Sequence, residues 1–71
     1  MYEKLDAAII ENVKRGNAKF GSIYDSVTFA IPHQQRVDGW RTVDRRLQAL
    51  RKKGLIRFIG GGWKITESEA E

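Results

Sequence analysis

The segment 40–66, WRTVDRRLQALRKKGLIRFIGGGWKIT, constrains the fold of this chain more than any other stretch. Its first half carries apolar residues at helical spacing and stops at Gly54, and its second half has two β-prone runs around Gly60–Gly62. This pattern predicts a helix that begins near 38–40, with Asp38 as its N-cap, and that is followed at once by a tight hairpin with the three glycines at its tip.

The residues before this segment predict two further helices. Apolar residues recur at helical spacing over 2–15 and again over 20–27, and Gly16 lies between the two stretches. The run 27–31, VTFAI, leaves two alternatives open, a short strand or the irregular end of the second helix, and the polar residues 32–38 are expected to form a loop. The order of elements therefore predicts an α+β domain spanning residues 1–71, with three helices forming the core and a C-terminal two- or three-stranded hairpin. An acidic tail at 66–71 is expected to fray.

The composition argues against an enzyme. The chain has 71 residues, no cysteine and one histidine, His33, so thiolate and histidine-rich metal sites are excluded. No paired carboxylates or nucleophile–base set stand out, and the glycines lie at a hairpin tip rather than in a phosphate loop between strand and helix. We expect no catalytic residue, no metal or cofactor and no small-molecule ligand. No run reaches the length of a membrane span and no signal-peptide pattern is present, so we expect a cytoplasmic protein.

Basic charge is concentrated in one part of the chain. The formal net charge is +4, and eight of the 13 basic residues lie between 36 and 57, opposed only by Asp38 and Asp44. A concentrated basic patch attracts polyanions, of which nucleic acid is the commonest. The alternative is a solvated helix surface that is basic without binding anything.

A helical wheel sorts the third helix into an inward and an outward side. With Val43, Leu47 and Leu50 facing inward, the opposite side carries a single exposed row, here named the stripe. The stripe consists of Arg41, Arg45, Gln48 and Lys52. Arginine can grip the O6/N7 edge of guanine and glutamine the N6/N7 edge of adenine, so the stripe suits base edges in double-stranded DNA.

Five positions, one of them the stripe residue Lys52, are candidates for phosphate contacts. Thr42 is placed early on the flank of the helix, where its hydroxyl could reach a phosphate, and Lys52 and Lys53 lie at the helix end. Arg57 and Lys64 flank the hairpin tip and could reach the phosphate backbone.

Other conspicuous side chains are expected to be structural. Arg46 falls near the core edge and is expected to extend to solvent or pair with an acid. Trp63 is expected to cover the core, and Ile56, Phe58 and Ile65 to pack on the helices.

The segment 42–65 resembles the winged helix-turn-helix superfamily, in which a recognition helix of the form TV-xx-xL-xxL-xxxGLI leads into a two-stranded wing. The matching positions are Thr42, Val43, Leu47, Leu50, Gly54, Leu55 and Ile56. The run 19–27, KFGSIYDSV, is similar to the helix before the turn in that family. The resemblance implies that the third helix enters the major groove, with base or phosphate contacts at Arg41, Thr42, Arg45 and Gln48. It places Arg57 and Lys64 on a wing that touches the DNA backbone or the minor groove.

Two functions are therefore considered. The first is sequence-specific binding of double-stranded DNA by a small transcriptional or recombination regulator of bacterial or phage type, which would be nucleoid-associated when bound. The second is a protein-interaction module that docks an acidic partner, and an exposed apolar patch around Phe29, Ile31 or Trp63 would favour it. The footprint of one such module is small, so useful specificity calls for a homodimer or a partner protein. Ile10 suits either a dimer contact or the core.

Overall fold

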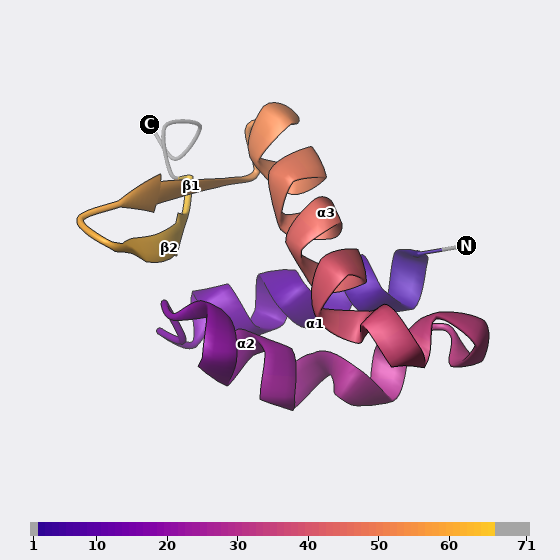
Figure 1. Cartoon of the computed structure of the whole chain (residues 1–71). Helices are drawn as coiled ribbons and strands as arrows, with labels where there is room; N and C mark the ends of the chain where they lie inside the picture. Colours follow the sequence, from indigo (N-terminus) through magenta and orange to yellow (C-terminus); the bar gives the residue numbers. More distant parts are fainter. Residues whose placement is uncertain (1, 67–71) are drawn as a thin grey trace.

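The computed structural model describes residues 2–66 and has three helices followed by a two-stranded antiparallel hairpin (Figure 1). The elements in chain order are α1 (Glu3–Lys14), α2 (Phe20–Val27), the 3₁₀ segments η1 (Thr28–Ala30) and η2 (His33–Asp38), α3 (Gly39–Lys52), β1 (Ile56–Ile59) and β2 (Gly62–Ile65). The predicted α+β class and the order of helices and hairpin are confirmed. Within the described residues, no helix combines the length and the apolar character needed to cross a membrane.

One hydrophobic core joins all three helices to the hairpin. Its buried members are Leu5, Ile9, Val13, Ile23, Val27, Ile31, Val43, Leu47, Leu50, Ile56 and Trp63. The predicted inward side of the third helix is confirmed, because Val43, Leu47 and Leu50 are almost completely buried. Ile10 also packs against this core, so core packing alone accounts for its apolar side chain.

The chain between α2 and α3 folds differently from the sequence prediction. Residues 28–30 form the 3₁₀ turn η1, so the irregular end of the second helix is the correct alternative and the strand is wrong. Ile31 is extended before Pro32, as the proline requires, but it is buried among the helices rather than paired with a strand. The predicted loop at 32–38 is also wrong, because it contains the 3₁₀ segment η2, which begins with a bond from Gln35 N–H to the Pro32 carbonyl.

The start of α3 is fixed by close packing rather than by a side-chain cap. Asp38 occupies the N-cap position, as predicted, but its side chain makes none of the capping hydrogen bonds that were expected of it. The reason is its backbone conformation, φ −111° and ψ 41°, which departs from the extended geometry that a capping residue normally has. η2 runs directly into α3, and Gly39 N–H bonds to the Arg36 carbonyl. A Cβ on Gly39 would lie 3.0 Å from Ile31 Cδ1 and 3.1 Å from the Tyr24 hydroxyl. Glycine therefore lets α3 begin close to α2.

The end of α3 matches the sequence prediction. Gly54 has a positive φ of 82°, and its N–H bonds to the Arg51 carbonyl, while Leu55 N–H bonds to the Leu50 carbonyl. These two bonds form a Schellman motif, which satisfies the last carbonyls of the helix and turns the chain sharply. The hairpin therefore starts directly beside the end of α3, as Figure 1 shows.

The hairpin has a two-residue tip, and a main-chain hydrogen bond joins it to the chain before α2. Gly60 and Gly61 both have positive φ, as a type I′ turn requires, whereas Gly62 belongs to β2 and pairs with Ile59. Trp63 N–H bonds to the Ala18 carbonyl at 2.8 Å, which ties β2 to the connection between α1 and α2. The sheet of the described residues thus has two strands, the smaller of the two predicted numbers.

The apolar side chains on one face of the hairpin differ in burial. Trp63 is 6% exposed and Ile56 is buried, as predicted, and Ile65 is half-buried against the core. Phe58 was expected to pack on the helices, but it is 55% exposed and meets Trp63 edge-on at 5.1 Å between ring centroids. Its larger neighbour already covers that part of the core.

The end of the described chain is tied to the hairpin. Thr66 was expected to belong to a frayed tail, but its N–H bonds to the Leu55 carbonyl at 3.1 Å. Residues 67–71, the rest of the predicted acidic tail, lie outside the described residues.

Candidate nucleic-acid interface

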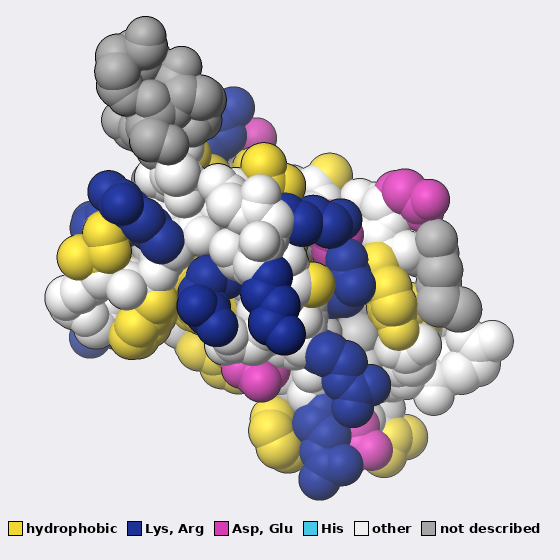
Figure 2. Space-filling model, turned by 90° about the horizontal axis from the view of Figure 1, so that it is seen from above, with side chains coloured by type: hydrophobic (Ala, Val, Ile, Leu, Met, Phe, Trp, Pro, Cys, Tyr) yellow, Lys and Arg dark blue, Asp and Glu magenta, His cyan; other side chains and the backbone are white. Residues whose placement is uncertain are grey.

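The stripe lies on the solvent side of α3, as the helical wheel predicts. Arg41, Arg45 and Lys52 are exposed and Gln48 is half-buried. Seen from above the view of Figure 1, lysine and arginine side chains gather across the middle of the surface that α3 occupies (Figure 2). The fold thus brings the four stripe residues together on a single surface.

An ion pair fixes the opposite flank of α3 on α1. Arg46 Nε and Nη2 donate to the two carboxylate oxygens of Asp6 at 2.9 and 2.7 Å, and the guanidinium lies 4.9 Å from the centre of the Tyr2 ring. Because Arg46 donates these hydrogen bonds to Asp6, the pKa of the Arg46 guanidinium is raised above its usual value. The expectation that Arg46 pairs with an acid is confirmed, and Arg46 belongs to the scaffold.

Thr42 does not lie on an exposed flank, and that prediction is wrong. The residue is only 9% exposed, and its hydroxyl donates to Gln35 Oε1 at 3.0 Å. The same oxygen accepts a bond from the Tyr2 hydroxyl at 2.9 Å. Thr42 therefore helps to join α3 to η2 and α1, and its hydroxyl is already occupied.

In the part of the chain that the structure describes, the exposed cations on the outer side and at the end of α3 lie apart from any carboxylate. Within residues 2–66, no carboxylate lies within 4 Å of the charged groups of Arg41, Arg45, Lys52 or Lys53. The Arg41 guanidinium stacks 5.4 Å from the centre of the neighbouring Trp40 ring. Like charges spaced three or four residues apart on a helix destabilise it by a few tenths of a kcal/mol per pair. An anionic partner would remove that repulsion.

The hairpin adds a second pair of like charges. Arg57 and Lys64 face each other directly across the two strands, and both are exposed. Like charges in this arrangement are destabilising, whereas an opposite pair would contribute roughly 0.2–1 kcal/mol. The two predicted wing residues thus share one site on the strand surface opposite the Phe58 and Trp63 rings. This arrangement also suits an anionic partner.

A groove runs beside the stripe and contains a contact that the sequence reasoning missed. Its volume is about 500 Å³, and it is lined by Phe20, Asp44, Gln48, Arg51, Phe58 and Trp63. In it, Arg51 Nε donates to Gln48 Oε1 at 3.0 Å. The spacing of three residues on one helix is a signal that could have indicated this bond. No comparable signal indicates the contact of Gln35 with Tyr2, which lies 33 positions away.

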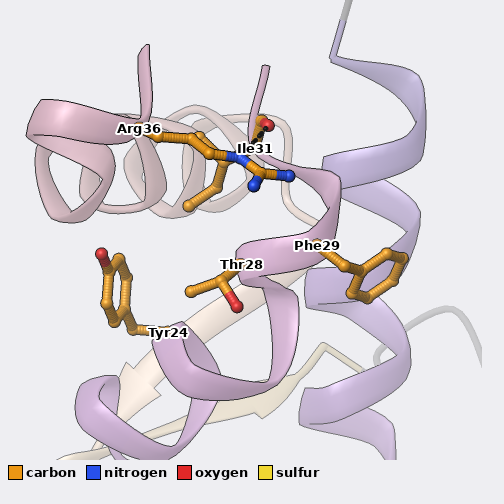
Figure 3. Close-up of a pocket in the computed structure, with 5 residues that line it drawn as sticks. All are labelled: Tyr24, Thr28, Phe29, Ile31 and Arg36. Atoms are coloured by element: carbon orange, nitrogen blue, oxygen red, sulfur yellow. Dashed lines mark hydrogen bonds between the residues drawn. The ribbon is translucent and has the colours of Figure 1, made fainter. Parts of the chain in front are cut away.

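A separate cavity of about 340 Å³ is lined by residues of α2, η1 and η2 and by Ile31. Figure 3 shows Arg36 reaching across it towards Ile31, with the Tyr24 hydroxyl turned to the same side and the Phe29 ring directed away. Of the three residues that could form an apolar patch, Phe29 is 64% exposed, whereas Ile31 and Trp63 are buried. The exposed apolar surface around Phe29 is therefore smaller than a patch of all three.

Neither a metal site among the described residues nor a similar known protein indicates the function of this chain. Among residues 2–66, no group of three or more His, Asp or Glu side chains is placed to hold a metal ion. No protein-family model matches the sequence, and comparisons with curated proteins and with solved structures find no match.

Proposed function

We propose that this protein binds double-stranded DNA in the manner of a winged helix-turn-helix domain, as a small transcriptional or recombination regulator of bacterial or phage type. The observation that carries the proposal is the state of α3. One flank of the helix is fixed to α1 through Arg46 and Asp6, while its outward cations have no carboxylate partner in the part of the chain described. A rigid helix with unpaired cations on its outer surface is suited to a polyanionic groove.

The dimensions of α3 fit the major groove. Its 14 residues span about 21 Å at 1.5 Å per residue, and B-DNA has a major groove roughly 12 Å wide, which admits one α-helix. Arg41 and Lys52 lie eleven residues apart, so the stripe extends over most of the helix. We assign Arg41, Arg45 and Gln48 to base edges and the lysines at the helix end, Lys52 and Lys53, to phosphates.

The hairpin supplies the backbone contacts of the wing. Arg57 and Lys64 are placed side by side by the strand register, so they present two cations to one stretch of phosphate backbone. The tip residues Gly60 and Gly61 carry no side chain that could enter the minor groove. We therefore propose contact along the side of the hairpin rather than insertion of its tip.

A chemical-shift map tests this proposal. Addition of a short duplex at low salt should shift the backbone amide signals of α3 and of Arg57 and Lys64, and leave those on the exposed side of α1 in place. Absence of shifts at any duplex concentration would overturn DNA binding.

A second candidate is docking of an acidic protein segment that carries an apolar side chain. The groove beside the stripe favours it, because aromatic rings line it and Phe58 is 55% exposed there. A volume of about 500 Å³ lies within the range of ligand pockets. The same map separates the two functions. If duplex leaves α3 unperturbed while an acidic peptide shifts Phe20, Phe58 and Trp63, protein docking replaces DNA binding.

A further inference from the structure

Three aromatic rings from different elements form the apolar side of the groove beside the stripe. Phe20 is the first residue of α2, Phe58 lies in β1 and Trp63 lies in β2. Phe58 is 55% exposed and meets Trp63 edge-on at 5.1 Å between ring centroids, so its ring is open to a further partner. Aromatic rings prefer edge-to-face or offset contacts with one another, so this side of the groove suits a flat aromatic group.

The α3 side of the groove carries two opposite charges that are not paired with each other. It is formed by Asp44, Gln48 and Arg51. Among residues 2–66, no cation lies within 4 Å of the Asp44 carboxylate, and no carboxylate lies within 4 Å of the Arg51 guanidinium. Arg51 Nε donates to Gln48 Oε1 at 3.0 Å, whereas its two terminal nitrogens make no hydrogen bond in this part of the chain. The groove therefore offers one free carboxylate and one fork of free donors.

The positions of these two charges on α3 allow one small group to bridge them. Asp44 and Arg51 are seven residues apart, about two helical turns, so they lie on the same side of the helix. Gln48 lies between them, and its bond with Arg51 Nε brings the guanidinium back along the helix towards Asp44. The two charged groups remain more than 4 Å apart, which leaves room between them for a group that carries both charges.

The charges of the groove favour a zwitterionic ligand. Asp44 and Arg51 sum to zero, so a ligand with a single charge meets one like charge, as the acidic segment considered above would at Asp44. A zwitterion meets two opposite charges. Its carboxylate can accept two parallel bonds from a guanidinium, and its ammonium has three donors for a carboxylate. An α-amino acid carries both groups on one carbon atom, and an aromatic one adds a ring that suits the apolar side of the groove.

We propose that the groove binds a free α-amino acid with an aromatic side chain. The terminal nitrogens of Arg51 hold its carboxylate, Asp44 holds its ammonium, and its ring lies against Phe20, Phe58 and Trp63. The volume of about 500 Å³ lies within the usual range of ligand pockets. This inference goes beyond DNA binding and does not depend on it. The residue types alone indicate no small-molecule ligand, because these side chains meet only where α2, α3 and the hairpin come together.

Titration of the full chain with L-phenylalanine, followed by NMR, tests the proposal. The indole signal of Trp63 and the backbone amide signals of Phe20 and Phe58 should shift saturably, whereas the amide signal of Lys14, which is exposed on α1, should stay in place. N-acetyl-L-phenylalanine amide keeps the ring and lacks both charges. Its dissociation constant should be at least about tenfold higher, which is what one charge-assisted hydrogen bond contributes.

Two variants separate the two charged contacts. Asp44→Asn and Arg51→Met should each raise the dissociation constant of phenylalanine about tenfold. Phenethylamine keeps only the ammonium, so Asp44→Asn should weaken its binding and Arg51→Met should not. Phenylpropanoate keeps only the carboxylate, so Arg51→Met should weaken its binding and Asp44→Asn should not. Asp25→Asn and Lys53→Met remove the same charges outside the groove, and they should leave the binding of all three ligands unchanged.

Four results would overturn the amino-acid site. The first is absence of a saturable Trp63 shift with phenylalanine, and the second is equal affinity for phenylalanine and its neutral derivative. The third is a response to an acidic peptide but not to phenylalanine, which would assign the groove to a protein partner. The fourth is an equal loss of phenylalanine affinity in the groove variants and in Asp25→Asn and Lys53→Met. All four leave the duplex titrations that test DNA binding unaffected.

Discussion

Asp6 and Arg46 lie 40 residues apart in the chain, and two parallel hydrogen bonds of 2.9 and 2.7 Å join them across the interface of α1 and α3. Both side chains are about one-fifth exposed, so water screens the pair less than it would an exposed one. The Tyr2 ring also lies against the Arg46 guanidinium. This contact sets how α3 is presented to solvent.

Replacing Asp6 by Asn should therefore destabilise the fold. The variant loses a charge-assisted bidentate contact and leaves Arg46 without its acid, and we expect a loss of about 1–2 kcal/mol in the free energy of unfolding. Urea denaturation measures it. Glu11→Gln is the matched control, because it removes the ion pair of Glu11 with Arg15. The Arg15 side chain is 71% exposed and that of Glu11 is 55% exposed, so this variant should lose far less stability. Equal losses in the two variants would contradict the scaffold role of Asp6.

Gly62→Ala should destabilise the hairpin where it meets the helices. An added Cβ would lie 2.7 Å from the Ala18 Cβ, an atom that cannot move without its backbone, and we expect a loss of about 1–3 kcal/mol. Gly21→Ala in α2 is the control, since nothing lies within 4 Å of its new Cβ and alanine favours a helix by up to about 1 kcal/mol. Thermal unfolding of both variants should therefore shift in opposite directions.

A double variant tests the cause of that loss. Combining Gly62→Ala with Ala18→Gly removes the clash, so the double variant should lose less stability than the sum of the two single losses. Additive losses would show that the clash is not the reason.

Thr42→Val should lower stability without changing DNA affinity. The substitution removes the hydrogen bond to Gln35, which we expect to reduce the free energy of unfolding by about 0.5–1.5 kcal/mol. Because the hydroxyl is buried in that bond, duplex titrations of folded protein should give the wild-type affinity and salt dependence. A weaker duplex affinity of the folded variant would support the phosphate contact that the sequence alone suggests.

Lys64→Glu should move stability and binding in opposite directions. It converts the facing pair Arg57 and Lys64 into an ion pair, so the hairpin should gain up to about 1 kcal/mol in unfolding free energy. The same change places an acid on the proposed backbone contact, so duplex affinity should fall. Unchanged affinity in the stabilised variant would remove the hairpin from the interface.

The parts of the fold that could be predicted from sequence are those set by local periodicity and backbone chemistry. Val43, Leu47 and Leu50 recur at the helical period, which predicts α3 and its inward side. Glycine readily adopts the left-handed backbone conformation in which many helices end, so Gly54 predicts the end of α3. The hairpin followed from two β-prone runs around glycines.

The parts that could not be predicted depend on neighbours distant in the chain. Thr42 is buried because η2 brings Gln35 beside it, and η2 itself has no apolar repeat that would reveal a helical turn. Phe58 is exposed because Trp63 takes the place on the core that either ring could have filled. The helical wheel predicts where the stripe residues lie on α3. The bond between Arg51 and Gln48 was found only from the side-chain geometry of the structure.

The central claim is most directly tested by titrating one duplex with two charge-matched double variants over a range of salt concentrations. Lys52→Ala/Lys53→Ala removes the two exposed cations at the end of α3 that we assign to phosphates, and Lys4→Ala/Lys14→Ala removes two exposed cations from α1. For the α3 variant, the slope of log affinity against log salt should be about two units shallower than for wild type, because each phosphate contact contributes close to one unit. The α1 variant should keep the wild-type slope. Equal slopes in the two variants, or no binding by the wild type at low salt, would contradict DNA recognition by α3.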